Sequence, residues 1–107
     1  MDPEHARRRL SEERSRVEQE LAGLGEETAE DEPRDFGDQA ADLDQSERDQ
    51  ALRQTLNETL AAIERAERRL QDGSYGISTA SGEPIPDGRL EAVPWAERRV
   101  EEEGPAQ

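Results

Sequence analysis

The sequence predicts a mainly α protein, built as an antiparallel coiled-coil helical hairpin that carries a small loop-rich knob and a short C-terminal helix. Three observations lead to this fold class. Two long segments carry apolar residues at helical spacing, an acidic segment without a period separates them, and the densest apolar cluster follows among glycines and prolines. Helices with one narrow apolar stripe each are too polar to be stable alone, so we expect them to pack against each other.

The first helix is expected from about Glu4 to Leu24. Its apolar stripe consists of Ala6, Leu10, Val17, Leu21 and Leu24. The acidic segment from Glu26 to Asp38 contains Pro33 and Gly37 and has no hydrophobic period, so it is predicted to be a loop.

The second helix is expected from about Gln39 to Gln71, with Asp72 and Gly73 as its stop signal. Its apolar stripe consists of Leu43, Leu52, Leu56, Leu60, Ile63, Ala66 and Leu70. The hairpin is therefore assigned to residues 1–72, with a tip loop at about 26–40. Charged residues on its outer faces, such as Arg65 and Arg69, are predicted to belong to a solvated surface.

Residues 73–103 are predicted to form the knob. Its apolar residues are Tyr75, Ile77, Ile85, Leu90, Val93 and Trp95. A two-stranded β element is expected near Gly76–Ile77 and Pro84–Ile85, and a short last helix from Trp95 to about Glu103. Trp95 is assigned to the core rather than to a contact surface, and residues 104–107 are expected to be a disordered tail.

The composition argues for a thin core and against a nucleic-acid partner. With 30% hydrophobic and 39% charged residues in a chain of 107, one elongated domain is favoured over a compact globule. The net charge of -14 repels a phosphate backbone, because nucleic-acid affinity comes largely from Lys and Arg. We therefore expect no direct contact with nucleic acid.

Catalytic and membrane signals are weak. The chain has no cysteine, and its single histidine, His5, lies close to a terminus that is expected to fray, so neither a nucleophile with its base nor a metal cluster can be assembled. No stretch approaches the length needed to cross a bilayer. A cytoplasmic protein that is not an enzyme is the expectation.

Two stretches of the knob resemble one family. Tyr75–Pro86 (YGISTASGEPIP) and Arg89–Ala96 (RLEAVPWA) are similar to the zinc-finger segment of the DksA/TraR family with its cysteines removed. Asp35–Ala40 (DFGDQA) is similar to the DxxDxA tip signature of that family, at the distance that an unbroken second helix requires. The resemblance covers about two thirds of the chain.

The resemblance implies that four zinc-ligand positions are degenerate. The family's two CxxC pairs fall on Ser78 and Ser81 and on Arg99 and Glu102. Tetrahedral zinc requires Cys sulfur or His nitrogen, so no Zn²⁺ is expected here, and no other cofactor is implied. The sequence leaves open whether guanosine tetraphosphate acts as a co-regulator, as it does with some members of the family.

The resemblance also implies a partner and a mechanism. Members of the family bind RNA polymerase with the knob on the rim of its secondary channel, and they pass the coiled-coil tip toward the active site. The residues in the tip positions are Asp35, Asp38 and Ala40. For Asp38, capping of the second helix remains an equal alternative, and Phe36 is either a staple over the helix start or an exposed contact.

The predicted function is therefore regulation of transcription by a monomer that binds RNA polymerase. Two alternatives remain open at this point. The chain either keeps the scaffold as an adaptor for another partner, or it is a structural coiled coil that associates with itself through its leucine stripe.

Overall fold

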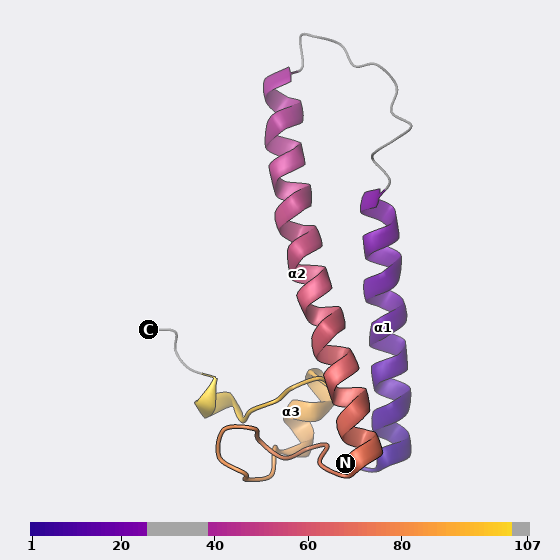
Figure 1. Cartoon of the computed structure of the whole chain (residues 1–107), viewed down its shortest axis with the longest axis vertical. Helices are drawn as coiled ribbons and strands as arrows, with labels where there is room; N and C mark the ends of the chain where they lie inside the picture. The colour runs from indigo at the N-terminus through magenta and orange to yellow at the C-terminus, as the bar shows by residue number, and fades with distance from the viewer. Residues whose placement is uncertain (26–38, 104–107) are drawn as a thin grey trace.

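The computed structural model describes residues 1–25 and 39–103, and for residues 25 and 39–44 it describes the backbone only. Two long helices, α1 (Pro3–Gly25) and α2 (Gln39–Asp72), run antiparallel and side by side (Figure 1). A short helix, α3 (Asp87–Ala92), lies beside the end of α2 and the start of α1, and a 3-10 turn, η2 (Val100–Glu102), lies farther out, away from both long helices. The molecule measures 55 × 33 × 19 Å. We call the helix pair the rod and the segment from residue 73 to 103 the knob.

The two predicted stripes face each other and form the core of the rod. Its buried residues are Leu10, Val17, Leu56, Ile63 and Ala66, and Leu21, Leu24, Leu60 and Leu70 pack against them. The helical period of the apolar residues therefore predicted both the helix limits and the faces that they bury, and the hairpin is confirmed. Arg14 bridges the helices with Nη2 at 2.6 Å from Oε1 of Glu67, and this ion pair adds little because both side chains stay partly in contact with water.

The packed seam between the two helices does not reach the N-terminal turns of α2. The Arg53 guanidinium donates a hydrogen bond of 3.3 Å to the carbonyl of Leu24, which puts the end of α1 at the level of Arg53. One position earlier on α2, Leu52 is 45% exposed. The first third of α2 consequently extends beyond α1, as Figure 1 shows.

The stop signal of α2 works as predicted. Gly73 adopts a φ of +87°, a conformation that glycine takes at little cost. The backbone N–H of Ser74 donates to the carbonyl of Arg69 at 2.9 Å, and its hydroxyl donates to Asp72 at 2.6 Å. The chain leaves the helix there and turns into the knob.

The predicted β element is reduced to one isolated antiparallel bridge between Ile77 and Pro84. It is supported by hydrogen bonds from Ile85 N to Gly76 O (2.7 Å) and from Ser78 N to Glu83 O (2.8 Å). Because a proline has no N–H, a longer ladder is not available on this side. The small knob core consists of Ile85, Leu90 and Ala96, against which Met1, Tyr75 and Val93 pack.

The prediction of a last helix from Trp95 to about Glu103 is wrong. Helical structure occurs earlier, in α3, and after Trp95 it is limited to the single turn η2. Val93 precedes Pro94 and has non-helical backbone angles, with φ at -134° and ψ at 83°, and this ends α3. The carbonyl of Glu97 then accepts the N–H of Thr79 at 2.8 Å, so it does not serve a helix of its own segment. Gly88 weakened the sequence signal of α3.

Several predictions fall on residues outside the described ranges: the loop at 26–38, the roles of Asp35, Phe36 and Asp38, and the tail at 104–107. The side chain of Leu43 in the predicted stripe is not described either. Within residues 1–25 and 39–103, neither long helix is apolar enough to cross a bilayer.

Candidate functional site

The four positions of the degenerate zinc site meet in the knob through hydrogen bonds. The hydroxyl of Ser78 donates to Oε1 of Glu102 at 2.6 Å, and the N–H of Arg99 donates to the same oxygen at 2.9 Å. The N–H groups of Ala80 and Ser81 donate to Ser78 Oγ at 3.0 and 3.2 Å. One carboxylate and one hydroxyl thus join the turn at 78–81 to the last segment of the knob.

The electrostatics of this contact follow from its donors. Hydrogen bonds from Ser78 and Ser81, and then from the backbone of Arg99, lower the pKa of Glu102 from the ordinary 4.5 to about 2. Glu102 is therefore ionised at neutral pH and acts only as an acceptor. The guanidinium of Arg99 pairs with Glu101 instead, with Nε at 2.9 Å from its carboxylate.

These residues do not fit a zinc ion. A guanidinium carries no lone pair for a metal, and a hydroxyl beside a single carboxylate is a poor ligand set for zinc. No group of three or more His, Cys, Asp or Glu that would suit a metal occurs in the described part of the chain. The knob instead closes through Ser78 and Glu102, and the loss of zinc coordination remains a prediction from the donor chemistry.

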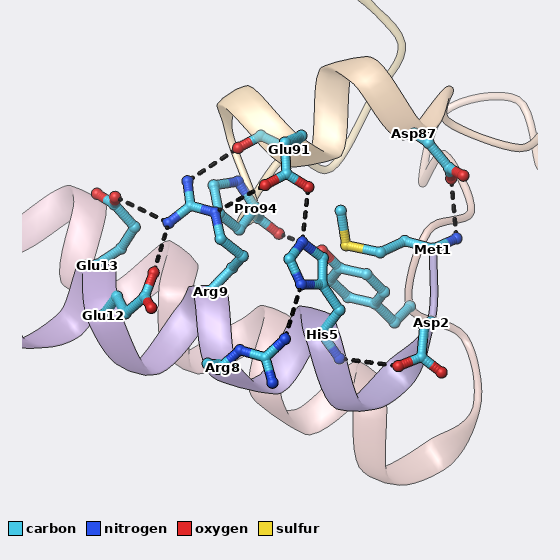
Figure 2. Close-up of polar contacts among 11 residues, drawn as sticks. Met1, Asp2, His5, Arg8, Arg9, Glu12, Glu13, Asp87, Glu91 and Pro94 are labelled. Atoms are coloured by element: carbon cyan, nitrogen blue, oxygen red, sulfur yellow. Dashed lines mark hydrogen bonds and ion pairs between the residues drawn. The ribbon is translucent and has the colours of Figure 1, made fainter.

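A second cluster joins α1 to the knob (Figure 2). His5 Nε2 lies 2.7 Å from Oε1 of Glu91, and the Arg8 guanidinium lies 3.1 Å from His5 Nδ1. Arg9 donates to the backbone carbonyl of Glu91 at 2.9 Å, and its Nε lies 3.4 Å from the carboxylate. His5 is thus bound into a contact between two elements, and the prediction that it lies in a fraying end is wrong.

The same surface involves the first residue. The Met1 ammonium lies 2.8 Å from Asp87, and the Met1 side chain is only 4% exposed against the knob core (Figure 2). Sequence analysis missed this cluster because the partners are separated by more than 80 residues, and only the approach of α3 to α1 brings them together.

A third cluster joins α2 to the knob. Arg65 Nε lies 2.6 Å from Oε2 of Glu97, and Arg69 Nη1 lies 3.5 Å from the same oxygen. Burial of Glu97 opposes its ionisation, but the two guanidinium groups prevail and lower its pKa. The prediction of a solvated face is therefore wrong for Arg69, which is 15% exposed, whereas Arg65 remains exposed although it is paired.

Two aromatic residues complete this region. The hydroxyl of Tyr75 donates to the carbonyl of Pro94 at 2.8 Å, and burial raises the pKa of Tyr75 to about 12. Trp95 packs against the core of the rod, which confirms its assignment to the core.

The tip residues are separate from these clusters. Asp35 and Asp38 lie outside the described ranges, and for Ala40 only its place in the first turn of α2 is described. Because Asp38 itself is not described, its role as a cap of α2 and its role at the tip both stay predictions.

A known structure shares this arrangement of rod and knob. The structure of transcription factor DksA2 from Pseudomonas aeruginosa is 29% identical, with a TM-score of 0.65, and the match covers 94% of this chain and 76% of that one. RNA polymerase-binding transcription factor DksA from Caulobacter vibrioides is 45% identical over 65 residues, which are 57% of this chain and 46% of the relative. This chain belongs to the DksA-like family.

Two other proteins are similar to parts of this chain. General stress protein 16O of Bacillus subtilis is 42% identical over 53 residues, which cover 50% of this chain and 32% of that protein. An uncharacterised protein of Aquifex aeolicus is 33% identical over 103 residues, which cover 86% of this chain and 67% of that protein. No family model matches the chain. The chain spans about a third of the length of General stress protein 16O and just under half of the length of the Caulobacter DksA.

Proposed function

We propose that this protein regulates transcription by binding RNA polymerase, with its knob at the rim of the secondary channel and its acidic tip directed toward the active site. One observation carries the proposal. A DksA2 structure matches 94% of the chain, so the likeness extends over the rod and the knob together. The matched relative from Caulobacter is named as a protein that binds RNA polymerase.

The dimensions of the rod support this proposal. At a rise of about 1.5 Å per residue, the 34 residues of α2 extend over about 51 Å. The helix pair is slender, because its core is a single seam of side chains between α1 and α2. A rod of this length and width suits insertion into a channel, while the knob at its base provides a wider stop.

The distribution of charge also supports it. Between Glu26 and Ala51 the chain has eleven acidic residues and two basic ones, which is most of its net charge of -14. An arm of this kind repels DNA and RNA, and it is attracted to basic protein surfaces and to magnesium near a catalytic centre. The proposed partner is therefore the polymerase itself, without a contribution from direct nucleic-acid contact.

The experiment combines binding with transcription. Purified RNA polymerase core is captured with the parent protein or with the double variant Asp35→Asn and Asp38→Asn, and initiation is measured in vitro. We expect the variant to bind and to lose the effect on initiation. The matched control is the double variant Glu58→Gln and Glu64→Gln, which removes the same charge from exposed positions of α2 that lie outside this acidic stretch. Normal regulation by the Asp35 and Asp38 variant would refute the tip mechanism.

Two other results would favour the alternatives. Absence of polymerase from the capture would favour an adaptor for another partner. A dimer in sedimentation at micromolar concentration would favour a coiled coil that associates with itself, whereas we propose a monomer. Neither an enzymatic activity nor a cofactor is part of this proposal.

A further inference from the structure

One short segment of the knob crosses the open end of the hairpin. The end of α1 and the start of α2 are joined through residues 26–38 of the sequence, but the start of α1 and the end of α2 have no covalent link of their own. The segment from Glu91 to Glu97 (EAVPWAE) contacts both helices there. We call this segment the strap.

The first end of the strap is bound to α1. The carboxylate of Glu91 contacts His5 and forms an ion pair with Arg9 (Figure 2). The backbone carbonyl of Glu91 accepts a further hydrogen bond from Arg9 at 2.9 Å. Arg9 is held in place by Glu12 and Glu13 on the next turn, at 3.2 and 3.3 Å. Its side chain is only 18% exposed, so this is a fixed guanidinium rather than a mobile surface one.

The second end of the strap is bound to α2. Glu97 pairs with Arg65 and Arg69, which lie one helical turn apart on the same face of α2. The carbonyl of Glu97 also accepts the N–H of Thr79 at 2.8 Å and its hydroxyl at 3.2 Å, which ties this end to the turn at 78–81. Arg69 is 15% exposed and is therefore as well fixed as Arg9.

The middle of the strap is largely apolar, and apolar packing alone fixes the orientation of the knob on the rod only weakly. Trp95 packs on the rod core and Ala96 on the knob core, while Pro94 accepts the Tyr75 hydroxyl. Apolar packing tolerates sliding and rotation, whereas charged hydrogen bonds fix distance and angle. The two glutamates thus provide the charged contacts of the strap with each helix, beside the Tyr75–Pro94 hydrogen bond and the separate Met1–Asp87 ion pair.

We propose that Glu91 and Glu97 are positioning residues that fix the orientation of the knob relative to the rod by binding one helix each. Removal of their charges leaves both apolar cores, the backbone contacts of Glu91 and Glu97 and the Met1–Asp87 ion pair in place, and it loosens the orientation of the knob on the rod. The functional consequence rests on the proposed function: a protein that docks its knob at one point and its tip at another depends on a preorganised angle between them.

The experiment measures that angle through distances between spin labels. The chain has no cysteine, so pairs of introduced cysteines report without background. One pair, Asn57→Cys with Glu83→Cys, joins the rod to the knob. A second pair, Gln19→Cys with Asn57→Cys, joins α1 to α2 and serves as the internal control. All three positions are exposed.

In the parent protein we expect one narrow rod-to-knob distance. In the double variant Glu91→Gln and Glu97→Gln we expect that distribution to broaden, while the rod distance and the helix content from circular dichroism stay unchanged. The variant Glu20→Gln is the matched control, because it removes an equally short ion pair, 2.8 Å from Arg16, that lies within α1 alone. It should leave both distances narrow.

The effect of salt on the rod-to-knob distance is a second measurement, and purely apolar packing would not produce it. Added salt should broaden the rod-to-knob distance in the parent and have little further effect in the double variant. The single variant Glu97→Arg should broaden the rod-to-knob distance. The triple variant Glu97→Arg, Arg65→Glu and Arg69→Glu, which exchanges the charges of this contact, should make the distance narrow again. A rod-to-knob distance that stays narrow in the double variant at every salt concentration would overturn the proposal.

The distances are measured without polymerase, so the two proposals fail separately. If the parent does not bind polymerase, the distances still decide the role of the strap. If it does, the double variant should bind with lower affinity than Glu20→Gln while its tip remains intact.

Discussion

Truncation of Ile63 is the most direct test of the rod core. Ile63 is fully buried in the seam between the helices, where it belongs to the cluster that contains Leu10 and Val17. Replacement by Ala removes the side-chain carbons beyond Cβ, at about 0.8 kcal/mol for each buried methylene, and leaves a cavity. Substitutions of this type in packed cores cost about 2–5 kcal/mol.

That cost is large for this molecule. A domain of this size is stable by about 5–15 kcal/mol, and each kcal/mol shifts the midpoint of thermal unfolding by roughly 4–8 °C. We therefore expect Ile63→Ala to lower the midpoint by about 10 °C or more. The assay is thermal and urea unfolding followed by circular dichroism, which reports the loss of helix directly.

The matched control is Leu52→Ala. This residue continues the same stripe on α2, but it is 45% exposed because α1 has ended. Its truncation should cost less than about 1 kcal/mol. Equal costs at both positions would refute the conclusion that the packed seam ends at the level of Arg53.

Two further predictions concern the closure of the knob. The folded pKa of Glu102 lies below its ordinary value, so its contribution to stability is complete above about pH 4.5 and is lost as the pH falls toward 2. The stability difference between the parent and Glu102→Gln should shrink over that range in urea unfolding, and a difference that stays constant from pH 7 to 2 would contradict the assigned contact. A chelator such as EDTA should leave the unfolding midpoint of the parent unchanged, and added zinc should not raise it, because we expect Ser78, Ser81, Arg99 and Glu102 not to bind zinc. Stoichiometric zinc in the purified protein, measured by atomic absorption, would show that the ligand positions are wrongly assigned.

The sequence determined the rod. Residues at helical spacing, such as Leu10 and Val17 on one helix and Leu56 and Ile63 on the other, identify the buried faces, because each helix has only one stripe to bury. The end of α2 was equally local, since Gly73 can adopt the positive φ that the turn requires. Local periodicity and turn chemistry act within a few residues, so they can be read along the chain.

Only the tertiary structure decided how the knob is attached. Among 28 acidic and 14 basic residues, nothing in the sequence selects Glu91 as the partner of His5 and Arg9, or Glu97 as the partner of Arg65. The same holds for the contact between Ser78 and Glu102, and for the helix that forms at Asp87–Ala92 rather than after Trp95. Such contacts depend on elements that are distant in sequence and meet only in the folded molecule, and ion pairs leave no periodic trace along the chain.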